Sequence, residues 1–169
     1  MNDIIFVNQT HLEELEAIPF FEGEISALAF DYGLKKIGVA YGQSITCVAK
    51  EVTILKARDG IPEWNDIAKI ILEWHPNFLV IGLPYNMDGS SGGLLSRAVT
   101  FAHRLNGRFQ IPCYGSDERL SSAEARDQKE GKEIFMRKRK ILAVDDTAAK
   151  IILEDWFKKI MRQKINTDI

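Results

Sequence analysis

The feature that most constrains the fold is the segment from Ile25 to Tyr32, which is apolar almost throughout until it reaches Asp31. Such a run is typical of a central strand that other elements cover on both faces. Gly33 follows and ends the run. The chain therefore has to build a layer on each side of this strand, and the strand carries a carboxylate at its carboxyl end.

The segments after this strand predict a mixed α/β domain. Two further strands joined by short turns make an antiparallel meander, and later strands that alternate with helices favour parallel pairing. Pro62 is expected to start the first helix. The expected strands are 25–32, 36–41, 46–55, 78–83 and 110–114, and the expected helices are 62–74, 93–106, one after 121, and 141–160. We predict a five-stranded mixed sheet with helices on both faces.

The length and composition indicate one folded domain. A chain of 169 residues with 46% hydrophobic and 27% charged residues is ordinary for a globular protein. We divide it into an acidic N-terminal extension (1–24), one domain (25–160) and a C-terminal tail (161–169). Leu12, Leu15 and Ile18 have near-helical spacing, which predicts a short helix in the extension.

The sequence shows no sign of a membrane or an export signal. No apolar run approaches the ~20 residues that span a bilayer, and no basic segment leads into an apolar one at the N-terminus. Cys47 and Cys113 alone indicate neither a disulfide scaffold nor a metal-binding cysteine cluster. We expect a cytoplasmic protein.

The net charge of -2 hides an asymmetry along the chain. Residues 1–24 hold six acids and no Lys or Arg, which leaves 18 acids and 22 bases, a balance of +4, for residues 25–169. Residues 126–140 carry seven bases and three acids and end in Arg137, Lys138, Arg139 and Lys140. This run is suited to nucleic-acid phosphates, although a solvated helix end has the same composition.

Three acids from separate elements are candidates for one site. Asp31 ends a strand, and ligands of open α/β sheets gather beyond the carboxyl ends of the strands. Asp117 and Glu118 follow another strand; Glu118 is the better candidate, and Asp117 stays open. Asp145 lies on the apolar stripe of the last helix, where an ionised carboxylate needs a partner.

Three such carboxylates would suit hard cations, because magnesium prefers oxygen ligands. We expect Mg²⁺ or Mn²⁺, with two ions roughly 3.5 to 4 Å apart that Asp31 bridges. Taken singly, each acid could as well end a strand, open a turn or cap a helix. The histidines have no metal-ligand spacing.

The loop from Pro84 to Gly93 is rich in Gly and Ser and lies between a strand and a helix. Its backbone N–H groups could bind a phosphate, although such loops more often serve as plain connectors. Arg97 and Arg104 on the following helix could extend the same surface or only aid solubility.

Four ordered blocks resemble the YqgF/RuvX family. They run from about residue 26 to residue 157 in the family's order and spacing, so the match is specific. The blocks are Phe30-Asp31-Tyr32-Gly33 with Ile37-Gly38-Val39-Ala40; Ile81-Gly82-Leu83-Pro84 with Asn86-Met87-Asp88-Gly89; Asp117-Glu118-Arg119-Leu120-Ser121; and Val144-Asp145 with Ala148-Ala149 and Ile151-Ile152-Leu153. Leu34 replaces a Thr that is common in the family, and residues 1–24 fall outside the usual family core.

The resemblance implies an RNase H-like fold and a bacterial nuclease that matures the end of 16S ribosomal RNA. It places the family's acidic positions on Asp31, Glu118 and Asp145. The expected substrate is precursor rRNA, branched DNA is an alternative, and ribosomal particles are possible partners. The residues that we expect to contact nucleic acid are Lys36, Asn86, Arg97, Arg119, Arg137, Lys138, Arg139 and Lys140.

Other functions compete with this hypothesis. The Asp-x-Gly after the first strand also occurs in actin-like kinases and ATPases, but those folds need two such domains, and this chain has room for one. A Holliday junction resolvase would need a dimer for two symmetric cuts, and the sequence does not give the oligomeric state. A non-catalytic RNA-binding module for ribosome assembly would keep the fold without needing all three acids.

Overall fold

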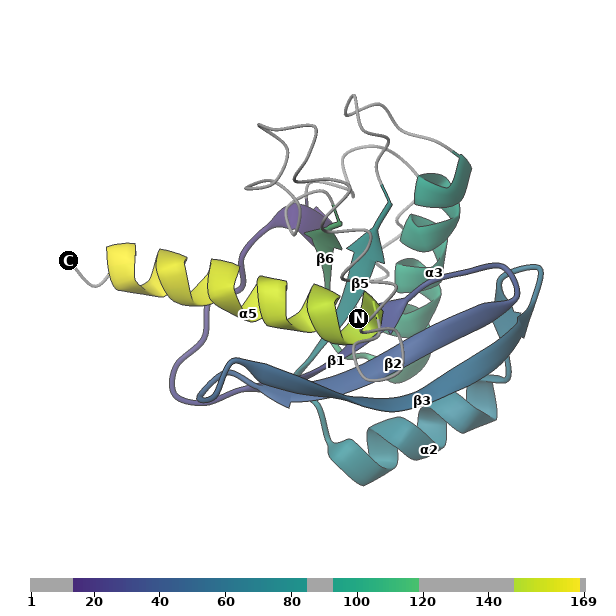
Figure 1. The fold of residues 1–169 in the computed structure, drawn as a ribbon, viewed down its shortest axis with the longest axis horizontal. Helices are drawn as coiled ribbons and strands as arrows, with labels where there is room; N and C mark the ends of the chain where they lie inside the picture. Colours follow the sequence, from purple (N-terminus) through teal and green to yellow (C-terminus); the bar gives the residue numbers. More distant parts are fainter. Residues whose placement is uncertain (1–13, 85–92, 119–147, 168–169) are drawn as a thin grey trace, which may run out of the picture.

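A computed structural model describes residues 14–84, 93–118 and 148–167 (Figure 1). These residues form a six-stranded sheet in the order β4-β3-β2-β1-β5-β6 with helices packed against it. The strands are β1 (Ser26–Asp31), β2 (Lys36–Gln43), β3 (Val48–Arg58), β4 (Ile61–Pro62), β5 (Phe78–Leu83) and β6 (Cys113–Asp117). The helices are α2 (Trp64–Trp74), α3 (Gly93–Phe109) and α5 (Ala148–Thr167).

The pairing of the strands confirms the predicted mixed sheet. Strands β1 to β4 form an antiparallel meander, whereas β1, β5 and β6 run parallel to one another. Strand β1 is thus central, as its apolar sequence predicts. The antiparallel meander followed by parallel strands is the mixed α/β arrangement that the sequence predicts.

The strand count differs from the prediction because of β4. Asp59 and Gly60 have φ angles of 50° and 79°, the left-handed values of a two-residue hairpin turn. That turn lets Ile61 and Pro62 pair with the end of β3, and proline is tolerated there because β4 is an edge strand. Helix α2 therefore begins at Trp64 instead of Pro62.

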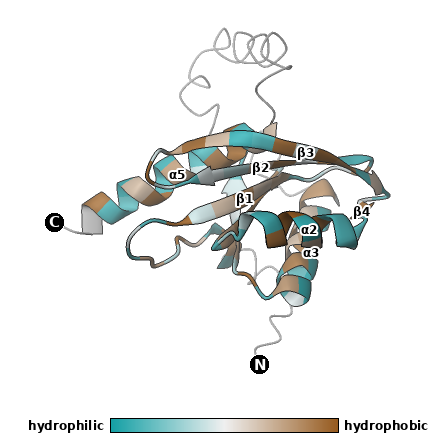
Figure 2. Cartoon of the chain, turned by 90° about the horizontal axis from the view of Figure 1, so that it is seen from below, coloured by the Kyte–Doolittle hydropathy of each residue, from teal (hydrophilic) through white to brown (hydrophobic). Residues whose placement is uncertain are grey.

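Helices cover both faces of the sheet. Residues Leu28 and Phe30 of β1 belong to a core on the side of α2 and α3, while Ala27 and Ala29 belong to a core with α5. Figure 2 shows α5 on one side of β1 and both α2 and α3 on the other. The two alanines present no bulk to α5, so this helix packs close to the sheet.

The connection between α3 and β6 shifts both elements relative to the prediction. Helix α3 continues to Phe109 and ends where Gln110 adopts a left-handed φ of 57° and donates its N–H to the Asn106 carbonyl. Strand β6 then begins only at Cys113 and ends at Asp117. Glu118 therefore lies immediately beyond the strand.

The two ends of the described chain pack against each other. Leu15 is fully buried in the core on the side of α2 and α3, whereas Ile18 and Phe21 pack against the core that contains α5. Helix α5 runs to Thr167, so residues 161–167, predicted as a tail, are helical. The Lys164 ammonium lies 4.6 Å from the centroid of the Phe21 ring. None of the helices that the structure describes has the length and apolar composition of a bilayer span.

Candidate active site

Asp31 ends β1 on the face of the sheet that α5 covers. Side chains alternate along a strand, so Asp31 shares the face of Ala27 and Ala29. It pairs with Gly38 of β2 and is half-buried. A Cβ added to Gly38 would lie 3.6 Å from the Asp31 Cβ and 3.7 Å from the Ala149 Cβ. The first described turn of α5 therefore lies next to Asp31.

Glu118 reaches the same face from β6. Tyr114 packs against Trp156 of α5, with ring centroids 6.0 Å apart, so the alternation places Ser116 and Glu118 on this side. The Glu118 backbone N–H donates to the Leu83 carbonyl at 3.2 Å. Asp117, one residue earlier, points to the opposite face. The backbone thus separates the two adjacent acids that the sequence left as alternatives.

Gly82 of β5 lies between the two carboxylates. Phe30 of β1 pairs with Ile81 of β5 in parallel register, so Asp31 and Gly82 are neighbours one step further along. A Cβ on Gly82 would lie 2.9 Å from the Glu118 Oε1 atom and 2.5 Å from the Ile152 Cδ1 atom. Since adjacent strands are about 4.8 Å apart, the Glu118 carboxylate above this glycine lies over the strand next to Asp31.

Glycines on both sides of Asp31 make the space for this pair. Gly38 and Gly82 flank Asp31 on the two neighbouring strands. A glycine within a strand is a signal of close approach by another group, and each of these glycines was visible in the sequence. Sequence reasoning missed their role because the partners come from distant elements.

The two carboxylates supply donors that fit a divalent cation. Carboxylate oxygens are the ligands that magnesium prefers, and the bare glycine backbone lets the Glu118 carboxylate approach the sheet at Gly82. Within residues 14–84, 93–118 and 148–167, no group of three or more His, Cys, Asp or Glu side chains could hold a metal ion. Asp145, the third predicted ligand, lies outside the described residues.

The predicted nucleic-acid contacts are divided between the described and the undescribed parts of the chain. Lys36 is exposed at the start of β2. Arg97 donates to the Asp59 carboxylate at 2.8 Å, and this hydrogen bond and the charge of Asp59 raise the pKa of the Arg97 guanidinium. The other predicted contacts lie outside the described residues: Asn86, Arg119, Arg137, Lys138, Arg139 and Lys140.

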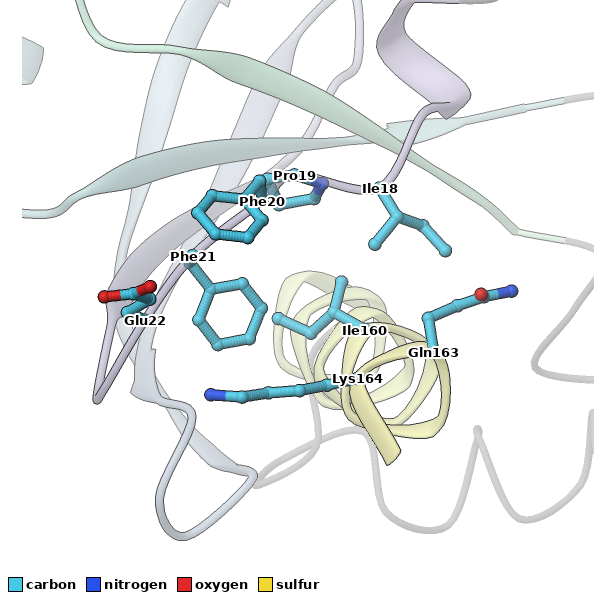
Figure 3. A pocket seen from close by; sticks show the side chains of 8 residues that line it. All are labelled: Ile18, Pro19, Phe20, Phe21, Glu22, Ile160, Gln163 and Lys164. Atoms are coloured by element: carbon cyan, nitrogen blue, oxygen red, sulfur yellow. The ribbon is translucent and has the colours of Figure 1, made fainter. Parts of the chain in front are cut away.

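Two concave surfaces lie away from the carboxylates. One is formed by residues 18–22 and the end of α5, where Ile160 and Phe21 face each other (Figure 3). The other lies between β3 and α2. Neither of these two surfaces contains Asp31 or Glu118.

Comparison with known proteins identifies the relatives of this chain. A family model described as "RuvX: Holliday junction resolvase" matches residues 25–159. A protein of Haemophilus ducreyi named "Putative pre-16S rRNA nuclease" is 51% identical over 132 residues, which cover 77% of this chain and 94% of that protein. Proteins of Glaesserella parasuis and Pseudomonas fluorescens with the same name are 47% and 46% identical, over 79% and 76% of this chain and 96% and 89% of their own lengths.

Among solved structures, the RuvC of T. thermophilus in complex with a Holliday junction substrate is 14% identical, with a TM-score of 0.49. The alignment covers 81% of this chain and 96% of that one.

The family match and the fold define the class of this protein as a nuclease, a hydrolase that acts on the phosphodiester bonds of nucleic acid. The chain belongs to the RuvX family, as its sequence blocks predict.

Proposed function

We propose that this nuclease is a metal-dependent endonuclease whose reaction takes place at Asp31 and Glu118. The observation that carries the proposal is that the Glu118 carboxylate lies over Gly82, the neighbour of Asp31 on the next strand, on the same face of the sheet as Asp31. Carboxylate oxygens are the ligands that Mg²⁺ and Mn²⁺ prefer, so a divalent cation suits these two acids. Asp145, three residues before α5 in the sequence, is our proposed third ligand.

The residues present fit Mg²⁺ or Mn²⁺, and we propose two ions. Bound there, such ions supply an activated water and stabilise the leaving oxygen of a phosphodiester. The protein's part is to hold the donors in place. Asp31 is fixed by the β1–β2 ladder, and the N–H of Glu118 is tied to β5. Buried residues of α5, including Ile152 and Ala149, keep water from the inner side of the site.

As substrate we propose the precursor of 16S ribosomal RNA, with a role in rRNA processing and ribosome biogenesis in the cytoplasm. The proposal rests on relatives that match this chain over most of their own length and carry the name pre-16S rRNA nuclease.

Junction-cleaving activity is the second candidate, because the description of the family model names a Holliday junction resolvase. Cutting a four-way junction symmetrically needs two active sites, so this function requires two copies of the chain.

Cleavage of matched labelled substrates tests these proposals. A precursor 16S RNA fragment and a four-way DNA junction are incubated with Mg²⁺, Mn²⁺ or chelator, using the wild type and Asp31→Asn. We expect metal-dependent cutting of the RNA that the substitution abolishes. Preferred cutting of the junction would favour the resolvase. Retained binding without cutting of either substrate would overturn the proposed nuclease mechanism and favour an assembly module.

A further inference from the structure

Two lysines face each other at the end of the β2–β3 ladder. Lys36 and Lys56 are direct partners in this antiparallel pair, and both side chains are exposed. Directly opposite side chains have Cβ atoms about 4.5 to 5.5 Å apart, and like charges in this arrangement destabilise a sheet. Neither ammonium group has a carboxylate partner among the described residues. Within residues 14–84, 93–118 and 148–167, no ion pair offsets this repulsion.

The lysine pair lies on the same face of the sheet as Asp31. Gly38 pairs with Asp31 on one side and with Ile54 on the other, and Lys36 and Lys56 follow two residues further along. From strand spacing and rise, the Cα atoms of Lys36 and Asp31 are roughly 8 Å apart. Figure 1 shows the paired ends of β2 and β3 extending beyond the described start of α5. The lysines are therefore accessible beside the carboxylates.

An exposed apolar side chain lies opposite Gly38, on the same face as the lysine pair. Ile54 is 53% exposed, although most aliphatic residues of the sheet are buried. Two ammonium groups beside a small apolar surface match the alternation of phosphate and sugar along a nucleic-acid strand. Each lysine offers three N–H donors and a full charge, which suits a phosphate without requiring a fixed geometry.

We propose that Lys36 and Lys56 together form a subsite for a backbone phosphate of the nucleic-acid substrate, next to the phosphate that is cut. This inference rests on the proposed function for the position of the cut, but the subsite itself binds without metal or cleavage. The charge repulsion in the free protein is relieved when the phosphate binds. The pair therefore lowers the stability of the free protein and strengthens substrate binding, a combination that is common at functional sites.

Binding measurements test the subsite independently of catalysis. Fluorescence anisotropy with a labelled precursor 16S RNA fragment, in chelator and at several salt concentrations, compares the wild type with a Lys36→Ala, Lys56→Ala double variant. We expect binding about tenfold weaker and a slope of log Kd against log salt reduced by about 1 to 2. Lys69→Ala is the matched control, because Lys69 is an exposed lysine of α2 on the other side of the sheet.

A second variant separates binding from folding. Lys56→Glu replaces the repulsive pair by an attractive one, so we expect a melting temperature about 2 °C higher together with weaker RNA binding. Wild-type affinity and salt slope in the double variant would overturn the subsite, as would a lower melting temperature in Lys56→Glu. A wild type that shows the lysine-dependent binding but cuts nothing would keep the subsite and overturn the nuclease mechanism instead.

Discussion

The Oε1 atom of Glu118 lies 2.9 Å from the position that a Cβ atom on Gly82 would occupy. A methyl group there would also lie 2.5 Å from Ile152, so both the carboxylate and α5 would have to move. For Gly82→Ala we expect a loss of about 1 to 3 kcal/mol of unfolding free energy and at least about tenfold slower cleavage. Chemical denaturation and initial rates measure the two effects.

Gly38→Ala is the matched control for this substitution. Its Cβ would meet Asp31 and Ala149 at 3.6 and 3.7 Å, which is ordinary van der Waals contact. We expect stability within about 0.5 kcal/mol of the wild type. If both alanine variants behaved alike, the proposed close fit of Glu118 over Gly82 would be wrong.

Repulsion between the carboxylates predicts a link between metal and stability. Mg²⁺ or Mn²⁺ should raise the melting temperature of the wild type, because an ion that binds only the folded state stabilises it. Asp31→Asn removes one negative charge, so it should stabilise the metal-free protein and abolish cleavage. Calorimetry with and without metal measures both. If neither Mg²⁺ nor Mn²⁺ changed the melting temperature of the wild type, the proposed metal site would be wrong.

Asp155 of α5 predicts a pH dependence of stability. Burial raises the pKa of this carboxyl, the charge of Lys158 lowers it, and the charge of Glu154 raises it. The net raised pKa means that the ionised form is disfavoured in the folded state, so stability is lost as the pH rises through that pKa. Asp155→Asn should therefore raise the melting temperature at pH 7, with a gain that disappears toward pH about 3.9.

Asp66→Asn serves as the contrasting control. Asp66 lies in the first turn of α2, where a negative charge is favourable to the helix dipole. Its substitution should lower the melting temperature slightly at pH 7. An Asp155→Asn variant that is also less stable at pH 7 would show that its carboxylate makes a favourable contact in the folded state.

Local sequence patterns predicted most of the sheet. The apolar run of β1 depends on burial alone, and β5 was predicted with its observed bounds, 78–83. The hairpin at Asp59 and Gly60 was missed, although Asp-Gly is a strong turn signal, because Pro62 was assigned to a helix start. The sequence predicts that the last helix ends at residue 160, whereas α5 continues to Thr167. The prediction is too short because residues 161–167 are mostly polar and lack an apolar stripe.

The candidate site was predictable only in part. The position of Asp31 follows from the end of its strand, and alternation along β6 now places Glu118 on its side of the sheet. The placement of Asp31 and Glu118 on either side of Gly82 depends on the register between β5 and its two neighbours, which no local pattern encodes. The Lys36 and Lys56 pair depends in the same way on the β2–β3 register, including the irregularity between Val39 and Ala40.

The most direct test compares the two adjacent acids after β6 in single-turnover cleavage of a labelled precursor 16S RNA with Mg²⁺. The account predicts that Glu118→Gln lowers the rate at least about 100-fold with RNA binding retained, because a metal ligand is lost. It predicts that Asp117→Asn, on the opposite face, stays within about threefold of the wild type. Full activity in Glu118→Gln, or equal losses in the two variants, would contradict the proposed site.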